Sequence, residues 1–208
     1  MRRGAPDRYR DILDAAERVI ARQGYAGAQV SRIAREAGVA GGTVYLYFAN
    51  KKDLLVSLFR ERFGRFIEAL DAAMAEAASA PEALRRLVGL HLGMLGERPE
   101  LAAVTQIEMR QADPEIRRGI DDALRPYFER IDAVLRRGIE EGAFDGGMDM
   151  RVAKRMIFGT LDQCVTAWVM SGYRYDLAAL VEPVCRLLLQ GLGGGAGGGR
   201  DDAKGAGR

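Results

Sequence analysis

Apolar residues recur at three- and four-residue spacing along most of the chain, which is the pattern of helices that bury one face. The spacing is clear near residues 12–20, 54–59 and 131–135. The alternation typical of strands is confined to the short run VYLYF, which follows two glycines and has no candidate partner strand. The pattern therefore predicts an all-α protein.

Glycines, prolines and capping residues divide this pattern into nine predicted helices. The predicted helices cover about residues 6–23, 31–37, 41–48, 51–78, 81–95, 99–111, 114–141, 149–171 and 177–189. Gly24 is expected to end the first helix, Gly38 to allow a tight turn after the second, and Asn50 to cap the fourth. Pro126 falls inside the seventh predicted helix and is expected to kink or split it.

The second and third predicted helices form a candidate helix-turn-helix with the sequence QVSRIAREAGVAGGTVYLYF, residues 29–48. Ile33, Ala34, Val39 and Val44 face inward, so the outer surface of the later helix is free to enter a DNA major groove. The alternative is a helical hairpin whose tyrosines only pack in a core, and for Tyr45 partial packing and exposure are left open. The candidate DNA contacts are Ser31, Arg32, Gly41, Gly42, Thr43, Tyr45, Leu46, Tyr47 and Lys51.

The charge distribution changes along the chain although the net charge is only +2. Residues 1–62 hold 12 Lys and Arg against 7 Asp and Glu, and the remaining residues hold 19 against 22. A basic N-terminal segment on a mildly acidic remainder is typical of a DNA-binding head on a separate body, although chance asymmetry would look the same.

The DNA-binding signature of the tetracycline-repressor (TetR) family closely resembles the run AGVAGGTVYLYFANKKDLL, residues 37–55. The resemblance covers about residues 8–66. It implies a homodimeric, nine-helix transcription regulator, most often a repressor, on palindromic operator DNA, with Thr43, Tyr47 and Lys51 at base edges and phosphates. The expected organisation is a three-helix DNA-binding head at 1–50, a ligand-binding and dimerisation body at 51–190, and a flexible glycine-rich tail at 191–208.

The body resembles one group within that family, the acyl-CoA-responsive regulators of fatty-acid degradation (FadR of the TetR type). The resemblance rests on the runs QIEMRQADPEIRRGI and MIFGTLDQCVTAWVMSG and on YDL at 175–177. It implies a repressor of fatty-acid-degradation genes that long-chain acyl-CoA releases from its operator. The alternative is a repressor of the same family that responds to another hydrophobic ligand or drug and controls efflux.

An acyl-CoA requires an apolar tunnel for its chain and cations for its phosphates. The candidate ligand-binding residues are Leu92, Leu95, Ile107, Arg110, Arg117, Arg118, Ile120, Leu124, Tyr127, Phe128, Ile157, Phe158, Leu161 and Trp168. Taken singly, each is more typical of an ordinary core or a solvated face, and only the combination with the resemblance favours a ligand tunnel.

Four polar residues, Gln106, Glu108, Asp162 and Gln163, interrupt otherwise apolar helices. Solvent exposure is their simplest interpretation, since burial would demand a partner such as Arg110. His91, the only histidine, is expected to be exposed or to have its hydrogen bonds satisfied.

The last two predicted helices have wide apolar faces, and in the family they pair with their mates across the dimer. Trp168 would then lie near both the tunnel and the interface.

Several function classes are excluded by what the chain contains. The start lacks an apolar signal core and no apolar stretch is long enough to span a membrane, so we expect a cytoplasmic protein. Two cysteines and one histidine leave no disulfide scaffold, no metal site and little general-base chemistry, which indicates a protein without cofactor that is not an enzyme.

Overall fold

The computed structural model describes residues 5–193, and every regular element in that range is helical. The prediction of an all-α fold is confirmed. Nine α-helices and one 3₁₀ helix follow in the order α1 (Ala5–Gly27), α2 (Val30–Glu36), α3 (Gly41–Val44), α4 (Lys51–Ala75), α5 (Ala80–Gly96), α6 (Pro99–Glu108), α7 (Pro114–Glu140), α8 (Met150–Met170), η1 (Leu177–Leu180) and α9 (Val181–Leu192).

Side-chain caps account for the start of most of the longer helices. The Asn50 side chain accepts a hydrogen bond from the Asp53 amide at 2.9 Å, as expected from the sequence. Ser79, Asp113 and Asp149 cap α5, α7 and α8 in the same way. These caps satisfy amides that the helix itself leaves without partners.

Two expectations about helix boundaries are wrong, and so is one of the two alternatives given for Pro126. The third helix ends at Val44 rather than residue 48, because residues 45–47 tighten into a turn in which Leu46 and Tyr47 donate to carbonyls three residues back. Pro126 does not split α7, which is one helix. Proline has no N–H to donate to the carbonyl of Asp122, four residues earlier. Because Asp122 is exposed, water can replace this hydrogen bond. The predicted tail begins inside α9, and its residues 194–208 lie outside the described range.

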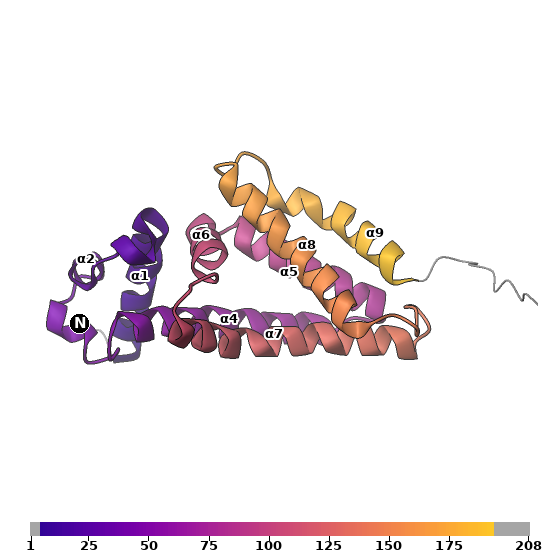
Figure 1. The fold of residues 1–208 in the computed structure, drawn as a ribbon, viewed down its shortest axis with the longest axis horizontal. Coiled ribbons are helices and arrows are strands. Elements are labelled where there is room, and N and C mark those ends of the chain that lie inside the picture. Colours follow the sequence, from indigo (N-terminus) through magenta and orange to yellow (C-terminus); the bar gives the residue numbers. More distant parts are fainter. Residues whose placement is uncertain (1–4, 194–208) are drawn as a thin grey trace, which may run out of the picture.

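Helices α1–α3 form a head at one end of the molecule, and α4 runs from this head into the body (Figure 1). α4 and α7 lie side by side along the molecule; α5 and α8 pack against them, and α9 packs on α5 and α8. α6 stands between α1 and α8 and contacts both. The head and the body are therefore joined by two routes, α4 and α6.

Two hydrophobic clusters hold this arrangement together. One lies wholly in the body, around residues such as Leu84, Tyr127 and Leu161. The other lies under the head but includes Val104 of α6 and Ile120 of α7. The core of the head is thus completed by helices of the body.

Two glycines permit close packing within the body. A Cβ atom at Gly119 of α7 would lie 2.6 Å from a methyl carbon of Val56 on α4, which is closer than real Cβ contacts. A Cβ atom at Gly138 would overlap the ring of Phe144. Gly119 lets α4 and α7 approach closely, and Gly138 accommodates the ring that closes the end of α7.

Candidate DNA-contact surface and ligand cavity

The turn between α2 and α3 has the geometry of a helix-turn-helix. Gly38 has φ +67°, a conformation that residues with a side chain rarely adopt, and the Val39 amide donates to the Ala34 carbonyl at 3.0 Å. Ile33, Ala34 and Val44 are buried beneath the turn. The two short helices are therefore fixed against α1 with one surface outward.

That outward surface holds most of the candidate DNA contacts. Ser31, Arg32, Gly41 and Gly42 are exposed and Thr43 is half-buried. Tyr45 is 57% exposed, which favours the exposed alternative, and Leu46 is 81% exposed. A leucine this exposed buries little apolar surface in the head and so does not stabilise its core, whereas it can contact a thymine methyl in a major groove.

Tyr47 and Lys51 lie at the edge of this surface and have partners inside the head. The Tyr47 ring is half-buried, 6.3 Å between centroids from Tyr9. Lys51 Nζ donates to the Ala26 carbonyl at 3.2 Å and lies 4.5 Å from the centre of the Tyr25 ring. Partial burial lowers the pKa of Lys51. Because an ammonium has three donors, Lys51 keeps some free for a phosphate.

The body encloses a small cavity of about 40 Å³ between α4, α5, α6, α7 and α8. Its wall is mostly apolar and aromatic. The residues that line it are Arg62, Phe63, Phe66, His91, Met94, Leu95, Leu101, Thr105, Gln106, Met109, Leu124, Tyr127, Phe158 and Asp162. Four of the candidate ligand residues are in this wall: Leu95, Leu124, Tyr127 and Phe158.

The other candidate ligand residues lie elsewhere. Buried in the cores but outside the wall are Leu92, Ile120, Ile157, Leu161 and Trp168. Phe128 lies at a separate surface hollow beside Asp132 and Lys154. Ile107 is 48% exposed, contrary to expectation, because α6 turns its other residues inward at this point.

Trp168 is neither in the cavity wall nor exposed for an interface. Its indole Nε1 donates to the Tyr175 carbonyl at 2.6 Å, and its ring meets Tyr173 edge to face. Trp168 therefore stabilises the loop that follows α8.

The three candidate cations differ in their relation to the cavity. Arg117 and Arg118 are exposed at the start of α7. Arg110 forms an ion pair of 2.6 Å with Asp162, which lines the cavity. Arg110 is therefore the candidate cation that is tied to the wall.

Of the four polar residues in apolar helices, Gln163 is exposed as expected, whereas for Gln106, Glu108 and Asp162 the expectation of exposure is wrong. Glu108 is buried and accepts from the Tyr25 amide of α1 at 2.7 Å. Gln106 is buried beside Thr166 of α8, with 2.7 Å between their side-chain polar atoms. Asp162 is partly buried and has the partner anticipated for it, Arg110. α6 thus has polar contacts with the head on one side and with α8 on the other.

His91 also contradicts expectation, since it is only 8% exposed and one ring nitrogen has no partner. Its Nδ1 lies 2.9 Å from the Tyr127 hydroxyl oxygen. Phe66 meets both rings edge to face. Burial lowers the pKa of His91 from 6.5 to about 4 and raises the pKa of Tyr127, so both groups are neutral at pH 7.

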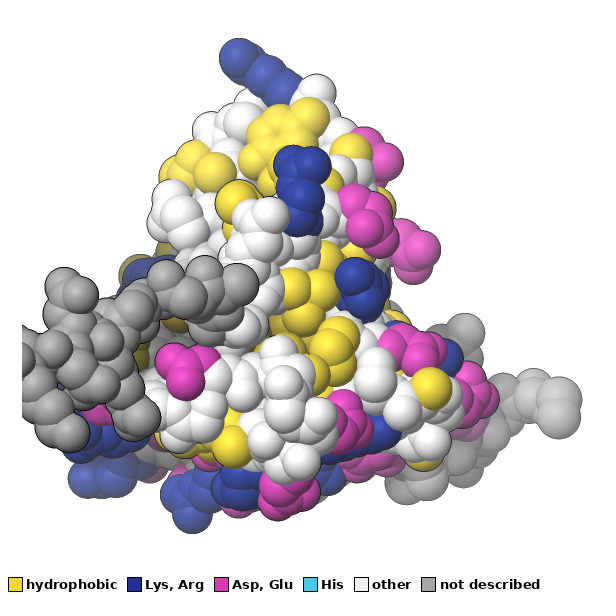
Figure 2. Space-filling model, turned by 90° about the vertical axis from the view of Figure 1, so that its right-hand side faces the viewer, with side chains coloured by type: hydrophobic (Ala, Val, Ile, Leu, Met, Phe, Trp, Pro, Cys, Tyr) yellow, Lys and Arg dark blue, Asp and Glu magenta, His cyan; other side chains and the backbone are white. Residues whose placement is uncertain are grey.

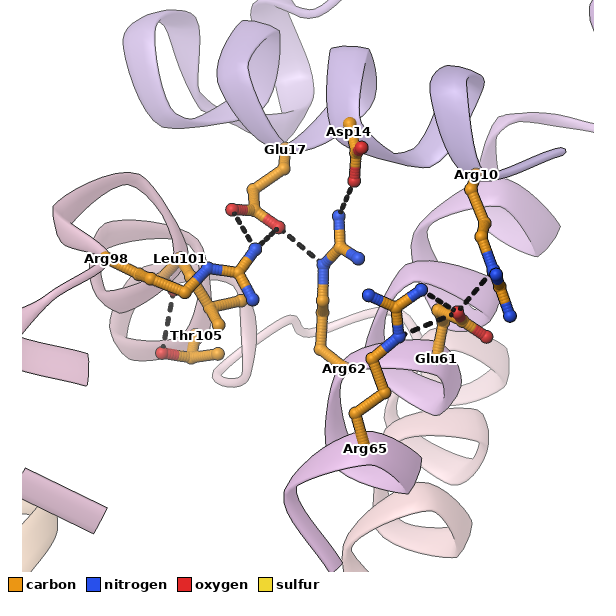
Figure 3. A network of polar contacts seen from close by, with 9 residues as sticks. All are labelled: Arg10, Asp14, Glu17, Glu61, Arg62, Arg65, Arg98, Leu101 and Thr105. Carbon is orange, nitrogen blue, oxygen red and sulfur yellow. Dashed lines mark hydrogen bonds and ion pairs between the residues drawn. The ribbon is translucent and has the colours of Figure 1, made fainter. Parts of the chain in front are cut away.

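Arg62 of α4, which lines the cavity and is 4% exposed, was not among the predicted site residues. Figure 3 shows its guanidinium directed at α1, where Nε is 2.6 Å from Glu17 and the other end meets Asp14. Arg98, which precedes α6, reaches Glu17 at 2.9 Å. In the sequence, the position of Arg62 within the apolar stripe of a helix was the signal that could have indicated a buried arginine. The network joins the cavity wall directly to the head.

The outer face of α8 and α9 exposes large apolar side chains, namely Val152, Met156, Met170 and Leu187. Figure 2 views the end of the molecule where α9 lies and shows hydrophobic side chains gathered between charged ones. Large exposed apolar side chains on two helices that pack against each other make this face a candidate interaction surface.

Within residues 5–193, none of the helices is long and apolar enough to span a lipid bilayer. In the same range, His, Cys, Asp and Glu side chains nowhere gather in threes that could bind a metal ion.

Two family models match consecutive parts of the chain. The model described as bacterial regulatory proteins, tetR family, matches residues 12–58. The model described as YsiA-like protein, C-terminal region, matches residues 59–191.

Relatives with known names match over most of their length. The fatty acid metabolism regulator protein of Bacillus subtilis is 46% identical over 185 residues, covering 89% of this chain and 95% of the relative. The structure of the fatty acid degradation regulator FadR from Bacillus halodurans is 50% identical with a TM-score of 0.86, covering 88% of this chain and 99% of that one. The structure of FadR from Bacillus subtilis in complex with stearoyl-CoA is 47% identical with the same TM-score and coverage.

Proposed function

Because the chain belongs to the TetR family of bacterial regulatory proteins, we propose that it represses genes of fatty-acid degradation and that long-chain acyl-CoA releases it from their operator DNA. One observation supports this above the others: identity of 46–50% to fatty-acid regulators extends through head and body alike, and one of those relatives holds stearoyl-CoA. Such a regulator acts in the cytoplasm and needs no catalytic group or cofactor.

The head provides the DNA-binding part of this function. In our proposal Gly41, Gly42, Thr43, Tyr45 and Leu46 face base edges in the major groove. The remaining candidates, Ser31, Arg32, Tyr47 and Lys51, contact the phosphate backbone. Since phosphate contacts dominate such affinity, operator binding falls as salt rises.

Two heads are needed to read a palindrome, and we place the dimer contact on the exposed apolar face of α8 and α9. Val152, Met156, Met170 and Leu187 supply the area that a partner would bury. The two heads would then lie about 34–36 Å apart, in successive major grooves.

The cavity is the proposed site for the acyl chain. Its volume of about 40 Å³ is room for only a few waters, so a long chain must displace side chains of α4, α5, α7 and α8 as it enters. Arg110, through its pair with Asp162, is the cation we place near the phosphates of the CoA.

Opening the cavity would change the position of the head, because Arg62 lines the cavity and is also paired with residues of the head. The residue lines the cavity, and its guanidinium is paired with Glu17 and Asp14 of α1. A chain that shifts α4 at Arg62 therefore moves α1 as well. Tenfold release of DNA requires that acyl-CoA prefer the DNA-incompetent shape by about 1.4 kcal/mol.

The test is a gel shift on the operator upstream of the protein's own or neighbouring genes, with and without a C16–C18 acyl-CoA. We expect acyl-CoA to release the DNA, whereas free fatty acid and CoA alone do not. A stable shift that ignores acyl-CoA would refute this ligand and favour the alternative of another hydrophobic effector. Absence of a shift at low salt would refute the DNA-binding function.

A pair of variants tests whether the ligand binds in the cavity. Met94→Trp fills the cavity from a half-buried position, so this variant should bind the operator normally but require more acyl-CoA for release. Glu97→Gln, an exposed change three residues further on, serves as the control. An equal response from both variants and the wild type would place the ligand elsewhere.

A further inference from the structure

Among the residues that line the cavity, His91 has a buried ring nitrogen whose hydrogen bonding is incomplete. His91 Nε2 is buried and has no partner, although the residue lines a cavity that is otherwise largely apolar. Leaving such a group unpaired costs about 1–3 kcal/mol, so natural proteins rarely keep one without a use.

The hydrogen bond at the other ring nitrogen determines what His91 Nε2 can do. If the Tyr127 hydroxyl donates to Nδ1, the proton of the neutral ring lies on Nε2, and only that one donor stays unpaired. If Nδ1 donates instead, both the Tyr127 hydroxyl proton and the Nε2 lone pair lack partners. The first arrangement leaves fewer buried groups unsatisfied, so Nε2 is a hydrogen-bond donor.

We infer that His91 Nε2–H donates to the carbonyl oxygen of the bound acyl group, with Tyr127 as the positioning residue that fixes the donor on that nitrogen. This inference rests on the proposed function, because it assumes an acyl ligand in the cavity. It adds a polar specificity element to a site that would otherwise select only for apolar volume. A ligand of the same length without a carbonyl would leave the donor unpaired and bind less well.

The test compares two CoA derivatives of equal chain length. Palmitoyl-CoA has the thioester carbonyl, and S-hexadecyl-CoA has a methylene in its place. For the wild-type protein we expect operator release at about tenfold lower concentration of the thioester. Equal potency of the two would overturn the role of His91 while leaving the proposed function intact. Failure of both to release DNA would refute the proposed function as well.

Variants assign the preference to the His91–Tyr127 pair. The double change His91→Phe with Tyr127→Phe removes both polar groups together, so no buried group loses its partner, and it should abolish the thioester preference. His91→Gln retains an N–H donor and should keep part of the preference. A double variant that folds, binds the operator and still prefers the thioester would refute the inference.

The single histidine permits a direct observation that does not depend on DNA. Protein labelled with ¹⁵N-histidine gives the two ring nitrogens of His91 alone. We expect the spectrum of a ring protonated at Nε2, with that signal shifted by palmitoyl-CoA and less so by S-hexadecyl-CoA. A ring protonated at Nδ1 would overturn the inference whatever the binding data.

Discussion

Mild acid should destabilise this protein through His91. Burial holds the pKa of His91 at about 4 in the folded chain, against 6.5 when the ring is exposed. Between these values the unfolded chain binds a proton that the folded chain does not. The resulting stability is therefore complete above pH 6.5 and is lost as pH falls toward 4.

The size of the effect follows from the two pKa values. At pH 5 nearly all unfolded rings are protonated and few folded ones are, which lowers the free energy of unfolding by about 2 kcal/mol per protomer. Below pH 4 the loss levels off at about 3 kcal/mol. These are large fractions of the stability of a domain, which is about 5–15 kcal/mol.

Urea unfolding at pH 7 and pH 5 measures this loss, at one fixed protein concentration because the protein is expected to be dimeric. The double variant His91→Phe with Tyr127→Phe is the control, since all other ionisable groups are the same in both proteins. We expect the wild type to lose about 2 kcal/mol more than the variant between the two pH values. Equal losses would show that the ring is solvated, and would refute its burial in the cavity wall.

Three further predictions concern other parts of the molecule. Gly138→Ala should lower the free energy of unfolding by about 1–3 kcal/mol in urea titrations, because its methyl would overlap a neighbouring ring. Gly64→Ala, which meets nothing within 4 Å on α4, should raise that free energy by up to about 1 kcal/mol; the opposite order would contradict the packing. Arg62→Met should leave operator binding measurable but blunt its response to acyl-CoA, since the link to Glu17 is gone; an unchanged response in gel shifts would exclude this route. Arg32→Ala should reduce the slope of log affinity against log salt by about one, and an unchanged slope would remove Arg32 from the phosphate contacts.

Much of the fold could be predicted from the sequence because its signals are local. The apolar spacing, the Asn50 cap and the turn at Gly38 depend on residues a few positions apart, and all three have their expected roles in the structure. The error at Pro126 came from treating the lost hydrogen bond as decisive, although at an exposed position water can replace it. The error at residues 45–48 came from extending a helix through what is a tight turn.

The cavity was less predictable because its walls come from five helices. Leu95, Leu124, Tyr127 and Phe158 were found as large apolar residues, but the same criterion also selected Ile107, which is exposed. The polar members were missed or taken for surface residues, since burial of a charge or an imidazole depends on partners distant in sequence. Arg62 is buried only because α1 supplies Glu17, and no local pattern encodes that contact.

The shared core under the head limits how such a regulator can exchange parts with its relatives. Val104 and Ile120 belong to the same apolar cluster as Ile12 and Val44, although at least 60 residues of sequence separate the two groups. A recombination event that replaced only residues 1–50 would pair a new head with α6 and α7 surfaces shaped for the old one. The inherited unit of DNA recognition is therefore discontinuous, comprising the first helices together with α6 and the start of α7. A chimera intended to change operator specificity should transplant both segments.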